Sequence, residues 1–135
     1  MARRARLLSL VLVGLLSRPL GAQTAIEVPS GQAVTWLDMV MDAPGPEGLT
    51  VRFRFLAPAI ARSGGTVDAE AAQADMARLC ETFALPRIAT TGPMPAQIII
   101  SLSDRPVAFG QPDPDVTQYF EAYRPEGDTC VWEPF

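Results

Sequence analysis

Two cysteines, Cys80 and Cys130, constrain this chain more than any other feature of its sequence. In an oxidising compartment they can pair only with each other within the chain. A bond between them would close a loop of 50 residues, for which chain entropy gives about 4 kcal/mol of stabilisation. CxxC spacing and an adjacent basic side chain, the signs of a redox-active thiol pair, are both missing from the sequence. We therefore expect a structural disulfide.

The first 22 residues have the pattern of a secretory signal peptide. Arginines within residues 3–6 precede an apolar run from Leu7 to Leu16, and small residues follow as far as Ala22. The run is shorter than the about 20 residues that a membrane span requires. We expect cleavage after Ala22, export to the periplasm or the exterior, no stable membrane span in the mature chain, and an oxidising environment for the cysteines.

The remaining residues, 23–135, are enough for one small domain. They contain all 15 Asp and Glu residues but only 7 of the 11 arginines, so the mature chain carries a formal charge of −8. So acidic a protein should repel nucleic acids and anionic lipids. The sequence has no histidine, which excludes Ser-His-Asp and Cys-His catalysis and the usual zinc sites. We expect no cofactor, no metal and no nucleic-acid partner.

The hydrophobic pattern predicts five strands. Apolar residues alternate with Arg52 and Arg54 in "LTVRFRFLA", which is the clearest strand, and "AQIIISLS" has the continuous apolar character of a central strand. The segments "VTQYFEAYRP" and "TCVWEPF" predict a hairpin with its turn at 125–128. "AVTWLDMVMD" favours a strand, although Thr35 and Asp38 also fit a helix-capping box.

One long helix is expected from Val67 to Ala84, where apolar residues recur at helical spacing and Pro86 should end it. Cys80 lies in the apolar stripe, so pairing with Cys130 would fasten the helix to the C-terminal hairpin. The predicted fold is a single α+β domain in which this helix packs on a mainly antiparallel sheet of four or five strands.

Arg52 and Arg54 are the first candidates for binding. At strand spacing, two guanidinium groups project from one face about 7 Å apart, which suits a carboxylate or a phosphate. The alternative is a solvated face, or cross-strand pairing with an acidic residue such as Glu121. Asp104 and Arg105 follow the predicted central strand and would either orient a ligand or stabilise a turn.

The C-terminal hairpin and the segment before it supply the other candidates. Tyr119, Glu121 and Tyr123 share one side of the first arm, where aromatic side chains serve either recognition or the core. Between the strands, Asp113 and Asp115 raise the possibility of calcium, but the segment lacks the glycine turn and late glutamate of an EF-hand loop. A rigid, proline-stiffened connection from Ser101 to Asp115 is the better interpretation.

Three stretches of the chain resemble a family of small exported bacterial proteins of unknown function. These are "LTVRFRFLAPAIA", "IIISLSDRPVAFGQPDPDVTQYFEAY" and "TCVWEPF". The resemblance spans roughly residues 28–135. It implies a signal peptide, and it transfers no activity and no catalytic residue.

We therefore expect a non-catalytic exported protein of the cell envelope that binds a partner or a small ligand. The alternative is a small hydrolase that uses carboxylates and arginine. An enzyme of that kind needs two acidic groups converging in a pocket, whereas a binding protein should present an apolar patch rimmed by charge.

Overall fold

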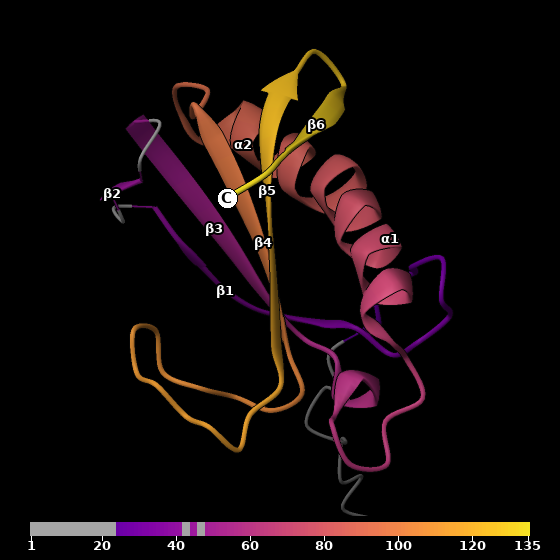
Figure 1. The fold of residues 1–135 in the computed structure, drawn as a ribbon. Helices are drawn as coiled ribbons and strands as arrows, with labels where there is room; N and C mark the ends of the chain where they lie inside the picture. The colour runs from indigo at the N-terminus through magenta and orange to yellow at the C-terminus, as the bar shows by residue number, and fades with distance from the viewer. Residues whose placement is uncertain (1–23, 42–43, 46–47) are drawn as a thin grey trace, which may run out of the picture.

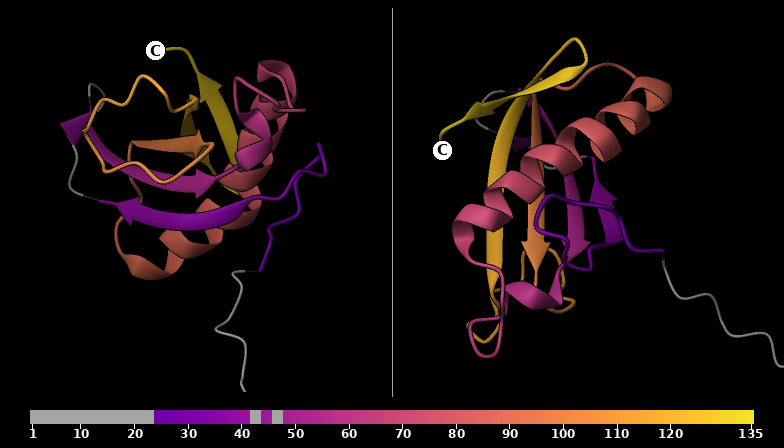
Figure 2. Two further views of the ribbon diagram at one scale, coloured as in Figure 1. Left: turned by 90° about the horizontal axis from the view of Figure 1, so that it is seen from below. Right: turned by 90° about the vertical axis from the view of Figure 1, so that its right-hand side faces the viewer.

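The computed structural model describes residues 24–41, 44–45 and 48–135; the predicted signal peptide, residues 1–22, lies outside them. One mixed sheet is covered on one face by a single long helical layer (Figures 1 and 2). The strand order is β1-β3-β4-β5-β6, and the two-residue β2, Pro44–Gly45, pairs with β3. The five longer strands are β1 (Thr35–Val40), β3 (Gly48–Leu56), β4 (Gln97–Ser103), β5 (Gln118–Glu126) and β6 (Thr129–Glu133).

The predicted α+β fold is confirmed. β3 and β4 pair in parallel, and the helical layer forms the crossover connection between them in the chain. All other strand pairs are antiparallel. β4 is the central strand, and all seven of its residues are buried. The hairpin turn is tighter than expected: Gly127, with φ 60°, and Asp128 alone connect β5 to β6.

The alternation within β3 and β4 separates the two faces of the sheet. One face packs against the helix and, with it, forms the hydrophobic core. The strands contribute Val51, Phe53, Phe55, Ile98, Ile100 and Leu102 to this core, and the helical layer contributes Ala72, Met76, Leu79, Cys80 and Phe83.

The helical layer is longer than the sequence predicts. α1 (Ala69–Leu79) begins where the Asp68 side chain accepts a hydrogen bond from Ala71 N, and the layer continues through the π-helical turn η2 (Cys80–Ala84) into α2 (Leu85–Thr91). The expectation that Pro86 ends the helix is wrong. Leu85 N–H bonds to the Cys80 carbonyl five residues back, which widens the turn, and Pro86 falls in the first turn of α2, where its missing N–H is tolerated.

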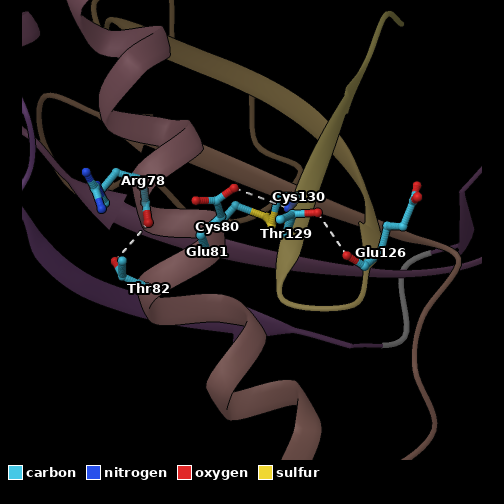
Figure 3. The surroundings of a disulfide bond; sticks show 7 residues. All are labelled: Arg78, Cys80, Glu81, Thr82, Glu126, Thr129 and Cys130. Carbon is cyan, nitrogen blue, oxygen red and sulfur yellow. Dashed lines mark hydrogen bonds between the residues drawn. A yellow bond between two sulfur atoms is a disulfide. The ribbon is translucent and has the colours of Figure 1, made fainter.

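The expected disulfide between Cys80 and Cys130 is present, with the two Cα atoms 6.2 Å apart. It joins the buried start of η2 to β6, as Figure 3 shows. The covalent bond therefore fastens the helical layer to the C-terminal hairpin, as the position of Cys80 in the apolar stripe predicts.

A buried carboxylate fastens the N-terminal segment to α1. Asp75 is fully buried, and its oxygens accept hydrogen bonds from Ser30 N at 2.8 Å, Ser30 Oγ at 2.5 Å and Gln32 Nε2 at 2.6 Å. The segment around this turn forms a single antiparallel bridge, between Ile26 and Val34. Across the described ranges, no helix has both the length and the apolar character of a membrane span.

Candidate functional site

The face of the sheet opposite α1 has no helix over it in the described part of the chain, and we call it the open face (Figure 2). Arg52 and Arg54 project from β3 onto this face, because their neighbours in the strand point into the core. The β4–β5 loop, residues 104–117, turns away from α1 on the same side, as Figure 1 shows in orange. The open face is thus bordered by a loop rather than by a helix.

A pocket of about 390 Å³ lies between the open face and the β4–β5 loop. Its floor comes from three strands and its rim from the outer part of the loop. The described residues that line it are Arg52, Arg54, Ser101, Val107, Ala108, Phe109, Gly110, Gln111, Pro112, Gln118 and Phe120.

Arg54 is already engaged by the protein. Its Nε lies 2.8 Å from Asp38 Oδ1 on β1, the residue directly opposite it in the sheet. The two atoms are close enough for an ion pair, although the N–H is not aligned for a hydrogen bond. Arg54 Nη2 also donates a hydrogen bond to the Val107 carbonyl at 2.8 Å. This buried side chain therefore joins β1, β3 and the β4–β5 loop.

Arg52 is in a different situation. Its guanidinium carbon lies 5.4 Å from the ring centroid of Phe109 and 5.5 Å from that of Phe120, so two aromatic rings flank the cation. Its Nε is buried and has no hydrogen-bond acceptor among the residues that the structure describes. Burial, and then the positive charge of Arg54, lower the pKa of Arg52 below its ordinary value. Arg52 is a half-buried cation without a matching carboxylate in the described ranges.

Asp104 and Arg105 stabilise the base of the loop. Asp104 Oδ1 accepts a hydrogen bond from Thr117 N at 2.9 Å, and Arg105 lies 3.6 Å from Asp104 Oδ2 and donates to the Asp115 carbonyl at 3.0 Å. Asp113 Oδ1 accepts from Asp115 N at 3.0 Å. These contacts hold the two ends of the loop together, which agrees with the interpretation of this segment as a rigid connection.

Tyr119, Glu121 and Tyr123 project to the helix side of the sheet, so the structure separates them from Arg52 and Arg54 on the open face and from Asp104 and Arg105 at the base of the loop. Glu121 accepts hydrogen bonds from Gln73 Nε2 at 3.0 Å and from Trp132 Nε1 at 2.5 Å. The suggested pairing of the β3 arginines with Glu121 is therefore wrong, because their side chains project from opposite faces.

Sequence reasoning missed three residues of the pocket or its rim: Asp38, Phe109 and Phe120. The spacing of Thr35 and Asp38 indicates only a helix cap for Asp38, and the ring of Phe109 comes from a loop whose path no local pattern specifies. Alternation in β5 puts Phe120 on the side opposite Tyr119 and Glu121, but it does not predict that the ring lies beside Arg52. The pairing of β1 with β3 places Asp38 opposite Arg54, the order β3-β4-β5 brings Phe120 near Arg52, and the path of the β4–β5 loop brings Phe109 there.

Comparison with known proteins identifies the family of this chain. A family model described as a family of unknown function (DUF6497) matches residues 13–135. The chain belongs to this family. The match confirms the resemblance to an uncharacterised family and spans every strand and helix that the structure describes. No curated protein and no solved structure matches the chain.

Proposed function

We propose that this protein is a non-catalytic binding protein of the cell envelope, and that it binds a small anionic ligand in the pocket beneath the β4–β5 loop. The observation that carries this proposal is the environment of Arg52. Its guanidinium group is partly withdrawn from water between two rings, yet within the described residues its buried Nε meets no acceptor.

An unpaired, half-buried guanidinium group is costly, because it has lost part of its hydration without gaining an ionic partner. An anion in the pocket would restore that interaction. A carboxylate or phosphate accepts two parallel hydrogen bonds from one guanidinium group, and such charge-assisted pairs are stronger than neutral ones. The aromatic rings that flank Arg52 also restrict its orientation and so lower the entropic cost of binding.

Binding is favoured over hydrolysis by the chemistry of the pocket. Hydrolysis by paired carboxylates needs two acidic groups that flank the bond to be broken. The described residues that line the pocket include no Asp or Glu, and the nearby Asp38 is occupied by Arg54. A binding function needs no more than the cation, the rings and the space beside them.

An envelope location is supported by two independent features. The basic and apolar pattern of the first 22 residues is typical of a signal peptide. The Cys80–Cys130 disulfide is of the kind that persists in exported proteins and is rare in the cytosol. Detection of the disulfide-bonded protein, shortened at its N-terminus, in the envelope fraction would test this part of the proposal.

Nuclear magnetic resonance titration of the oxidised protein with acetate, benzoate and inorganic phosphate tests the pocket. We expect amide shifts to change in residues 107–111 and 118–120 on addition of at least one anion, and these changes to be lost in Arg52→Met. The matched control is Arg78→Met, which removes an exposed arginine from α1 on the other side of the sheet and should retain binding. The proposed function would be refuted if the shift changes persisted in Arg52→Met, or if none of the three anions produced any.

A further inference from the structure

The charges around the pocket indicate how many negative charges its ligand carries. Arg52 and Arg54 supply two positive charges, and Asp38 contributes one negative charge at 2.8 Å from Arg54 Nε. The net charge of this group is therefore +1. The second negative charge of a dianion would meet the carboxylate of Asp38 rather than another cation. Repulsion between two like charges a few ångströms apart is considerable near a protein surface. A ligand with one negative charge matches the group.

The walls of the pocket indicate what carries that charge. Phe109 and Phe120 are large apolar side chains that remain 49% and 40% exposed beside Arg52. Val107 and Pro112 extend the apolar wall along the loop. A ligand with an apolar body would cover these surfaces while its charged end meets the guanidinium group. The volume of about 390 Å³ lies toward the lower end of the usual range for ligand sites, which suits a body of one ring.

We propose, resting on the proposed function, that the pocket selects a monocarboxylate attached to an apolar, ring-sized body, and that Asp38 determines this selectivity by neutralising Arg54. A carboxylate fits the planar guanidinium fork of Arg52 through two hydrogen bonds. Asp38 is not among the described residues that line the pocket, and its carboxylate lies against Arg54, so it does not bind the ligand body. It acts as a specificity-determining residue through the charge that it cancels.

Such a carboxylate has two natural sources: a free organic acid, or the C-terminal residue of a peptide that ends in an apolar side chain. Both present the same group to Arg52. Phenylacetate represents the first source, and a tetrapeptide ending in phenylalanine represents the second, with its C-terminally amidated form as control. Binding of phenylacetate together with failure of the acid tetrapeptide identifies the free acid, and the reverse identifies the peptide.

Calorimetric titration of the oxidised protein at pH 8 and about 0.15 M salt tests the selectivity. The probes are phenylacetate, phenyl phosphate as a dianion, acetate without the ring, and phenylacetamide without the charge. We expect wild type to prefer phenylacetate, or the acid tetrapeptide, over each of the other three. Because Coulomb energy scales with charge, Asp38→Asn should raise affinity for the dianion by twice the free energy that it adds for the monoanion. A gain of about threefold for the monoanion thus corresponds to about tenfold for phenyl phosphate.

Asp113→Asn is the matched control, because it removes the same charge from the β4–β5 loop while an asparagine oxygen can still accept from Asp115 N. It should leave the ratio of the two affinities unchanged. A second variant, Phe109→Ala, alters an exposed residue of the loop and should weaken the binding of phenylacetate much more than that of acetate. This variant tests the apolar half of the proposal even if Asp38→Asn does not fold.

The outcomes separate the two proposals. If wild type binds phenyl phosphate as well as phenylacetate, or if Asp38→Asn leaves their ratio unchanged, the role of Asp38 is overturned while anion binding stands. If acetate binds as tightly as phenylacetate, or Phe109→Ala weakens both equally, the apolar body is overturned. If no anion binds wild type in either assay, the proposed function itself fails.

Discussion

Asp75 and Arg52 are both withdrawn from water, on opposite sides of the sheet, and their surroundings differ. Asp75 beneath the N-terminal segment is fully buried and accepts three hydrogen bonds from Ser30 and Gln32. Arg52 on the open face has two aromatic neighbours, and no acceptor for its Nε appears in the described residues. The first environment completes the fold, whereas the second leaves an interaction to be made by something else.

The same contrast holds for other charged residues. Glu121 on the helix side is satisfied by Gln73 and Trp132, and it ties β5 to α1 and to β6. Burial of a charge therefore does not by itself indicate a site in this protein. The informative feature is burial with an unmet hydrogen-bonding requirement beside an accessible cavity.

The largest effect should come from the covalent link on the helix side. Replacement of both cysteines, Cys80→Ala with Cys130→Ala, should lower the free energy of unfolding by about 4 kcal/mol, because the unfolded chain regains the entropy of a 50-residue loop. Urea denaturation, compared with wild type under oxidising conditions, measures this loss. A loss below about 1 kcal/mol would mean that the noncovalent contacts of the helical layer hold the hairpin without the bond.

The next effect should come from Asp75. Asp75→Ala leaves the donors of Ser30 and Gln32 without their acceptor, and we expect a loss of about 3 kcal/mol. Glu70→Ala, an exposed position on the same helix, is the control and should leave the unfolding midpoint nearly unchanged. If the two substitutions lowered stability equally, the buried hydrogen bonds of Asp75 would not be what stabilises the fold.

Arg54 and Arg52 test the comparison within one strand. The alternation of β3 places both side chains on the same face of the sheet. Arg54→Met removes the contacts with Asp38 and Val107 and should lower the free energy of unfolding by about 2 kcal/mol. Arg52→Met loses the contacts with two rings alone and should cost less than about 1 kcal/mol. Thermal denaturation of the two variants measures the difference. The reverse order would make Arg52 the structural residue and Arg54 the candidate for ligand binding.

The smallest effect concerns Tyr123, which is buried beside Glu121. Burial, followed by the negative charges of Glu121 and Glu81, raises the pKa of its hydroxyl above the ordinary value of 10.0. The folded protein keeps this proton at a pH where the unfolded chain loses it. The free energy of unfolding should therefore fall as pH rises above about 10, by at most about 1.4 kcal/mol per pH unit.

Tyr123→Phe should weaken this dependence by about 1 kcal/mol between pH 9 and about pH 11, because phenylalanine has no proton to lose in either state. Urea denaturation of both proteins at the two values measures it. Parallel losses in wild type and variant would show that the Tyr123 hydroxyl does not distinguish the folded from the unfolded state.

Much of the fold follows from local patterns. The strand at residues 49–57 and its two faces follow from alternation, and β4 follows from a continuous apolar run. The helix follows from the apolar residues at helical spacing, and the C-terminal hairpin follows from its two strand patterns, although its turn is shorter than predicted. Local reasoning failed at Pro86, because a proline rule that holds for a regular α-helix does not hold where a π-helical turn changes the hydrogen-bond spacing.

The sequence by itself determined the disulfide pair, the class of fold and which side chains of β3 avoid the core. Only the tertiary structure decided that β3 and β4 are parallel neighbours, that Asp38 stands opposite Arg54, and that Phe109 reaches Arg52 from the loop. The reason is physical. Alternation and turn propensity depend on residues a few positions apart, whereas strand order, register and loop path depend on contacts between distant segments, and the pocket is made of those contacts.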